Sequence, residues 1–149
     1  MNKKKLNYRV TYLEMNRKPS FDWPKNLKHK LSILLAESFP AWYFLFFYKH
    51  VGKNYYWTDW LRKSEDEIDE FVNDKNVLLY TLIKDGWPVG FYMLDYRKKD
   101  ICDLSFFGLV DEVIGIGLGK YLLQTAILTA WDSKKIKKLT VNTLSLIHI

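Results

Sequence analysis

Residues 103–131 read DLSFFGLVDEVIGIGLGKYLLQTAILTAW, and this stretch decides the fold. Asp103–Leu109 predicts a strand, Ile114–Lys120 is a loop with three glycines, and apolar residues then recur at helical spacing as far as Trp131. Glycines at a helix start let a ligand approach the main chain, where free N–H groups attract anions. The stretch therefore predicts a strand, a phosphate-binding loop and an amphipathic helix.

Two common phosphate-binding motifs do not fit this loop. A P-loop would need a glycine at Ile114 and a serine or threonine at Tyr121. The dinucleotide-binding fingerprint would need its third glycine at Lys120, and we expect no βαβ unit around the loop. The residue spacing therefore disfavours both motifs.

The loop resembles the pyrophosphate-binding motif of the GNAT superfamily of N-acetyltransferases, Gln/Arg-x-x-Gly-x-Gly/Ala. Gly117 and Gly119 supply its two glycines. The family's first Gln or Arg is Ile114 here, and the basic residue common two places later is Ile116. Phosphate binding is therefore left to main-chain amides and to Lys120.

The resemblance covers most of Ala41–Thr143 and implies that the chain binds acetyl-CoA as a co-substrate. In the family, the strand before the loop parts from its neighbour, and the pantetheine arm pairs with it. The resemblance implies the following cofactor-binding residues: Phe107, Gly108, Leu109, Ile114, Gly115, Ile116, Gly117, Leu118, Gly119 and Lys120.

Acetyl transfer to an amine needs a base and a donor to the thioester oxygen. Asp103 resembles the family's carboxylate base, which often lies on the strand before the loop, although Asp103 also fits an exposed strand residue. Gly108 would allow a bend that exposes main-chain N–H groups, or it could simply end the strand. Lys120 is either a phosphate contact or a surface residue placed unfavourably against the helix dipole.

Composition sets broader limits on the class of protein. The chain has 149 residues, 48% of them hydrophobic, which is typical of one globular domain. Its net charge of +6 comes from scattered lysines and arginines, so we expect no nucleic-acid partner. The lone Cys102 reads as a core residue, and the three histidines share no metal-ligand spacing. Since no apolar run could cross a bilayer, we expect a cytoplasmic protein without membrane contact.

Outside residues 103–131, the pattern predicts an α/β fold in which helices flank a mixed central sheet. Ser64 and Glu67 have the spacing of a helix capping box, and Asp85-Gly86 marks a hairpin. The aromatic helix and the aromatic loop 55–60 could pack in the core or line an acceptor site. The expected strands are Tyr8–Leu13, Val77–Ile83, Val89–Tyr96, Ile101–Leu109 and Lys138–Thr143, and the expected further helices are Leu27–Phe39 and Trp42–Tyr48.

The family normally continues beyond Thr143 into a helix that carries a tyrosine and a closing pair of strands. We therefore interpret residues 1–143 as one incomplete N-acetyltransferase domain with an uncovered sheet edge, and Leu144–Ile149 as a non-native tail. The expected acceptor is a small-molecule or peptide amine, and the sequence leaves the oligomeric state open. Two alternatives are a non-catalytic acyl-CoA-binding module and a basic nucleic-acid-binding protein.

Overall fold

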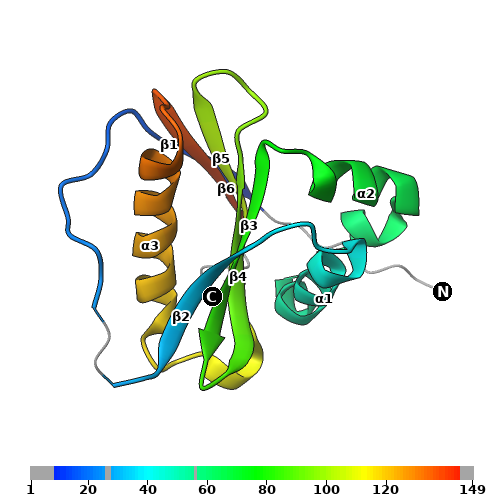
Figure 1. The fold of residues 1–149 in the computed structure, drawn as a ribbon, viewed down its shortest axis with the longest axis horizontal. Helices are drawn as coiled ribbons and strands as arrows, with labels where there is room; N and C mark the ends of the chain where they lie inside the picture. Colours follow the sequence, from blue (N-terminus) through cyan, green and yellow to red (C-terminus); the bar gives the residue numbers. More distant parts are fainter. Residues whose placement is uncertain (1–8, 26–27, 56, 145–149) are drawn as a thin grey trace.

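The computed structural model describes residues 9–25, 28–55 and 57–144, which form one six-stranded sheet with helices on both faces (Figure 1). The strands are β1 Val10–Met15, β2 Leu31–Ala36, β3 Val77–Lys84, β4 Trp87–Asp95, β5 Ile101–Leu109 and β6 Lys138–Leu144. The helices are α1 Ala41–Gly52, α2 Glu65–Asn73 and α3 Leu118–Ser133, and the short 3-10 turns are η1 Lys53–Tyr55, η2 Asp59–Arg62 and η3 Asp111–Val113.

The strand order is β1-β6-β5-β4-β3-β2, and every neighbouring pair is antiparallel except β5 and β6. Because α3 connects these two parallel strands, they form a βαβ unit around the glycine loop. Our expectation that no such unit surrounds the loop was therefore wrong. The expectation of an uncovered edge was also wrong, because β1 pairs with β6 along Val10–Met15.

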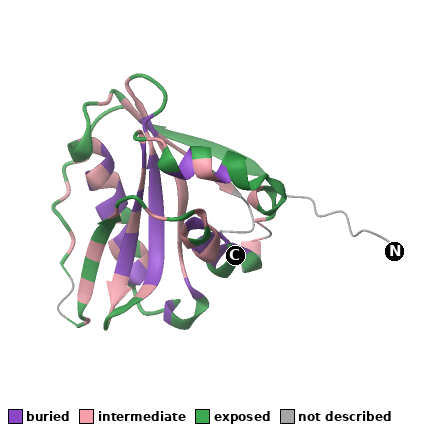
Figure 2. Ribbon diagram, turned by 45° about the vertical axis from the view of Figure 1, so that its right-hand side comes forward, coloured by how far each residue is buried: buried purple, intermediate pink, exposed green. Residues whose placement is uncertain are grey.

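The core lies between the sheet and the helices on each side of it. In Figure 1, α3 covers one face of the sheet, and α1 and α2 cover the other. The strand β4 is buried along most of its length, whereas the outward sides of the helices are exposed (Figure 2). Phe44 and Phe47 of α1 and Leu122 of α3 are each 0% exposed, so both helical layers pack tightly on the sheet.

One predicted helix is a strand in the structure. Leu31–Ala36, inside the predicted helix Leu27–Phe39, forms β2 and pairs antiparallel with β3. Leu27 itself lies outside the described residues, as does Tyr8 at the start of the first predicted strand. Hydrogen bonding to β3 has here overridden the helical propensity of a leucine-rich segment.

The other local predictions are confirmed. The Ser64 hydroxyl accepts a hydrogen bond from the Glu67 N–H at 3.2 Å, which caps α2. Asp85 and Gly86 adopt φ of 52° and 90° in the turn between β3 and β4.

Leu144, the first residue of the predicted tail, pairs with Val10, and the rest of that tail lies outside the described residues.

Candidate functional site

The strands β5 and β6 run side by side for only four residue pairs and then part. Their pairing begins at Ile101 with Lys138 and ends at Leu104 with Val141, although β5 continues to Leu109. The second half of β5 therefore has no ladder partner on its β6 side among the described residues. Main-chain groups on that side of Ser105–Leu109 are left for water or a ligand.

A β-bulge lies at the point where the strands part. Met93 and Leu94 of β4 are consecutive, but their partners on β5 are Phe106 and Leu104, so Ser105 is an extra residue. A bulge bends its strand and increases the local twist. The bend that the sequence assigned to Gly108 is therefore better explained by Ser105.

Gly108 has a different role, because α1 packs directly against it. A Cβ atom at Gly108 would lie 2.2 Å from Cγ1 of Val51, which is far closer than non-bonded carbon atoms approach. Gly108 also lies within β5, so it does not end the strand. Close approach of a helix to the strand explains this glycine.

The glycine loop joins the end of β5 to α3. Its buried anchors are Val113, which is 3% exposed, and Leu118, which is 0% exposed. Between them, Gly115 and Gly117 adopt φ of 91° and 86°, and a Cβ on either would meet no atom within 4 Å. The two glycines therefore provide a left-handed backbone and open space.

α3 begins without a side-chain cap. Gly117 occupies the cap position and has no side chain to offer, and the first turn contains no acidic residue. The first N–H groups of a helix have no partner within the helix, and the dipole makes this end positive. Lys120, which is exposed in the same turn, adds a positive charge. The end of α3 therefore fits an anionic group.

The side chains of the predicted cofactor-binding residues differ in their positions. Ile114 and Ile116 are 53% and 46% exposed, so they border the loop as apolar side chains facing solvent. Leu118 is buried, which leaves only its main-chain N–H for a ligand. Phe107 and Leu109 lie on the unpaired half of β5 and are partly buried.

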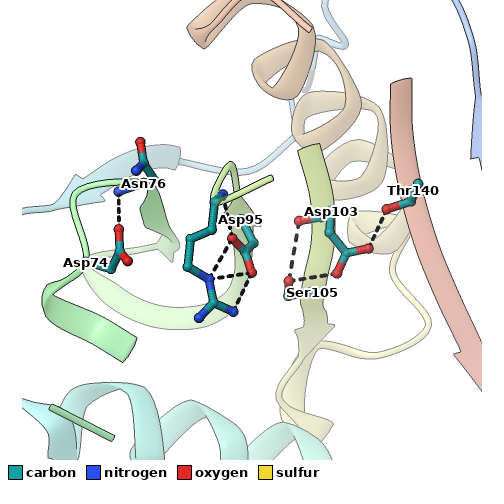
Figure 3. A network of polar contacts seen from close by, with 7 residues as sticks. Asp74, Asn76, Asp95, Asp103, Ser105 and Thr140 are labelled. Carbon is teal, nitrogen blue, oxygen red and sulfur yellow. Dashed lines mark hydrogen bonds and ion pairs between the residues drawn. The ribbon is translucent and has the colours of Figure 1, made fainter. Parts of the chain in front are cut away.

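Asp103 lies on β5 beside the point where the strands part, and two hydroxyl groups hold its carboxylate (Figure 3). The Thr140 hydroxyl donates to Oδ1 at 2.6 Å, and the Ser105 hydroxyl donates to Oδ2 at 2.9 Å. Both oxygens thus have a donor, while Asp103 forms no ion pair with a described residue. Asp103 is thus a half-buried strand residue held by two hydroxyl groups, and its role as a base stays a prediction.

Asp103 lies on the face of the sheet opposite α3. Its neighbour Cys102 is buried beside Tyr96, whose hydroxyl donates to the Ala130 carbonyl oxygen of α3 at 2.8 Å. Successive side chains of a strand alternate between faces, so Asp103 faces the other way. Asp103 and the glycine loop therefore lie on different faces and near opposite ends of β5.

A cleft of about 680 Å³ opens over Asp103. Its floor is a row of side chains on neighbouring strands, in which Asp95, Asp103, Thr140 and Glu14 are successive cross-strand partners. The described residues that line it are Tyr12, Leu13, Glu14, Asp95, Arg97, Lys98, Ile101, Asp103, Thr140 and Asn142. The strand β1 thus supplies one wall of the cleft.

Two of the three carboxylates in the cleft are neutralised. Arg97 binds Asp95 through Nε at 3.0 Å and Nη2 at 2.8 Å, and these hydrogen bonds raise the pKa of Arg97. Glu14 forms an ion pair with Lys138 at 3.2 Å. Within the part of the chain that the structure describes, Asp103 is therefore the one carboxylate of the cleft whose partners are neutral hydroxyl groups.

The sequence could not identify most of this cleft. Of its lining residues, only Asp103 was singled out, because the cleft depends on pairing between segments at opposite ends of the chain. Residues two apart in a strand share a face, so the sequence places Tyr12 with Glu14 in one β-rich segment and Thr140 with Asn142 in another. It does not reveal which strands are neighbours.

The aromatic segments pack together on the α1 side of the sheet. Phe106 of β5 contacts Phe44 of α1 with ring centroids 5.2 Å apart and Trp57 at 5.9 Å. Phe44 and Tyr48 are 0% and 2% exposed, so packing explains these side chains. Trp42 differs, because it is 67% exposed.

Two further classes of site find no support in the described ranges. No group of three or more His, Cys, Asp or Glu side chains within them lies close enough to hold a metal ion. Burial raises the pKa of the Cys102 thiol to about 12, which confirms a core residue rather than a nucleophile. No helix in these ranges is both long and apolar enough to span a membrane.

Comparison with solved structures agrees with this geometry. The chain is similar to a GCN5-related N-acetyltransferase from Kribbella flavida, with 11% identity and a TM-score of 0.62 over 91% of this chain and 50% of that one. It is also similar to an aminoglycoside acetyltransferase from an uncultured soil metagenomic sample in complex with sisomicin, with 15% identity and a TM-score of 0.59 over 74% and 76% of the two chains.

A third similar structure is a GNAT family acetyltransferase from Elizabethkingia anophelis with acetyl-CoA bound, at 17% identity and a TM-score of 0.50 over 68% and 58% of the chains. The chain therefore has the GNAT fold, as the sequence predicted. It spans about half the length of the Kribbella flavida protein. No protein-family model and no curated protein matches the sequence.

Proposed function

We propose that this chain forms the core of an acyl-CoA-dependent N-acyltransferase that transfers an acetyl group to a primary amine. The observation that carries the proposal is the parting of β5 from β6 after Leu104 and Val141. This gap lies between the glycine loop, on the α3 side, and Asp103 in the cleft on the other face. An extended ligand in the gap would reach both.

The dimensions and the chemistry of the gap fit an acyl-CoA. Asp103 and Leu109 are separated by roughly 20 Å along β5, at about 3.3 Å per residue. A linear arm with amide groups can bond to the unpaired edge of β5, and its diphosphate can lie at the uncapped end of α3. Lys120 would contact the phosphates, and Ile114 and Ile116 would cover the arm's apolar part.

In this proposal, Asp103 is the base. The amine nitrogen bonds to the acetyl carbon, the carbon–sulfur bond breaks, and the proton lost by the amine passes to Asp103 directly or through one water. The thiolate that leaves takes a proton from solvent. Main-chain N–H groups of Phe107–Leu109 would donate to the thioester oxygen as negative charge develops on it.

The neighbouring structures support acetyl-CoA as donor and an amine as acceptor. The Elizabethkingia anophelis protein contains acetyl-CoA, and the metagenomic enzyme contains sisomicin. Both are similar to this chain in fold only. For this chain we therefore propose only the chemical class of each ligand, an acyl-CoA donor and an amine acceptor. We propose a cytoplasmic location because acetyl-CoA is found there.

Calorimetric titration with acetyl-CoA tests the proposal, using Gly117→Val with Gly86→Val as its matched control. Both glycines have φ near 90° and open space around them, so both substitutions strain the backbone similarly. Only Gly117 lies at the start of α3. We expect Gly117→Val to weaken acetyl-CoA binding at least tenfold and Gly86→Val to leave it unchanged.

Two results would contradict the proposal at different levels. If wild-type protein gives no heat with acetyl-CoA, the glycine loop is not an acyl-CoA site. If acetyl-CoA binds but no thiol is released with any amine, the chain is a non-catalytic acyl-CoA-binding module. If wild-type protein does release thiol, Asp103→Asn should abolish the release and leave acetyl-CoA binding intact, which separates catalysis from binding.

A further inference from the structure

The charges that line the cleft do not all have partners within it. Among the described residues, five charged side chains line the cleft, and Arg97 neutralises Asp95 while Lys138 neutralises Glu14 from outside. The two that remain are Asp103 and Lys98. Neither forms an ion pair with a residue in the described ranges, and Lys98 is exposed.

We propose that the acceptor is a primary amine that also carries an anionic group, with its amine at Asp103 and its anion at Lys98. This inference rests on the proposed function and specifies the substrate class of the same site. One negative and one positive group that form no ion pair with a described residue, in one cleft, are complementary to a zwitterion. A second cation on the acceptor would instead meet the positive charges of Arg97 and Lys98.

The size and the position of the cleft agree with this class. Its 680 Å³ exceeds the space that a single small amino acid needs and lies within the usual range for ligand sites. Tyr12, Leu13 and Ile101 add apolar surface between the polar groups. An acceptor of the size of a dipeptide would therefore fit better than ammonia or a simple alkylamine.

The experiment compares L-alanyl-L-alanine with its C-terminal amide, using thiol release from acetyl-CoA. The two acceptors have the same size and amine, and they differ in the anionic group. We expect a kcat/KM roughly fivefold higher for the free carboxylate, as for an ion pair at a partly exposed site. The ratio of the two values is the measured quantity.

Lys98→Glu and Lys99→Glu provide a matched pair of variants. Both change the net charge equally in the same loop, but only Lys98 lines the cleft. Lys98→Glu should reverse the preference so that the amide is favoured, whereas Lys99→Glu should retain the wild-type ratio. Because each variant is compared with itself, changes in overall activity cancel.

The outcomes separate this inference from the function on which it depends. Equal use of the two acceptors by wild-type protein, a preference for the amide, or the same ratio in both variants would overturn the anionic acceptor and leave the acyltransferase in place. Failure to release thiol with every amine would overturn the proposed function and the inference with it.

Discussion

Replacing Gly108 by alanine should destabilise the protein through one contact with α1. The new Cβ would lie 2.2 Å from Cγ1 of Val51, whereas ordinary contacts begin at 3.4 Å. Val51 is 2% exposed, and a β-branched side chain in a helix has one strongly preferred rotamer. The two groups must therefore separate by displacement of α1 or β5.

The expected cost follows from this overlap. Inserting a methyl group into a packed core typically costs about 1–3 kcal/mol, and alanine recovers roughly 0.5 kcal/mol relative to glycine in a strand. We expect Gly108→Ala to lower the free energy of unfolding by about 2 kcal/mol. Val51→Ala removes Cγ1 and Cγ2 and should by itself cost about 2 kcal/mol.

The double variant is the decisive measurement. Without Cγ1, the atom of residue 51 nearest to the new methyl group is Cβ at 3.5 Å, an ordinary contact. Urea unfolding of the four proteins should therefore show that the double variant is at least 1 kcal/mol more stable than the sum of the single effects predicts. If the two effects add within about 0.5 kcal/mol, close packing does not explain Gly108.

Three further predictions concern the site and the stability of the fold. Thr140→Val should lower kcat about tenfold, because it removes a hydroxyl that lies 2.6 Å from Oδ1 of Asp103. Thr140→Ser keeps the hydroxyl and should retain activity. Steady-state kinetics checks both variants, and the KM for acetyl-CoA should be unchanged in each. Ser64→Ala should lower the free energy of unfolding by about 1 kcal/mol and Ser64→Asp should not, as measured by urea unfolding. Burial raises the pKa of Cys102 to about 12 in the folded protein, so its contribution to stability should be complete below about pH 8.5 and fall as the pH rises towards 12. Urea unfolding at pH 8 and at pH 10.5 checks this: between the two pH values, the free energy of unfolding should fall less for Cys102→Ala than for wild-type protein.

The sequence predicted the elements whose signals are local. Ile101–Leu109 was predicted with the bounds that the structure gives β5, because an alternating apolar segment precedes a glycine loop. The hairpin at Asp85-Gly86 and the cap at Ser64 also depend on a few adjacent residues. Local chemistry is sufficient for such features, so they can be read from one sequence.

The errors concern features that depend on distant partners. Leu31–Ala36 has the leucines of a helix, and only pairing with β3 makes it a strand. The coverage of β6 by β1 joins the two ends of the chain and leaves no local sign. For the same reason, Asp103 could be proposed as a base from its place before the loop, but its partner Thr140 could not.

The extra residue in β5 connects several parts of the candidate site. Because Ser105 is bulged, its hydroxyl can turn back to Asp103, while Phe106 still reaches the aromatic cluster around Phe44. If Leu104, Ser105 and Phe106 ran as a regular strand without the bulge, alternation would place Phe106 on the α3 face with Leu104 and would remove it from that cluster. The bulge also coincides with the last pair between β5 and β6, since pairing ends at Leu104. The bulge thus lies where the support of the carboxylate, the packing of α1 and the start of the gap meet.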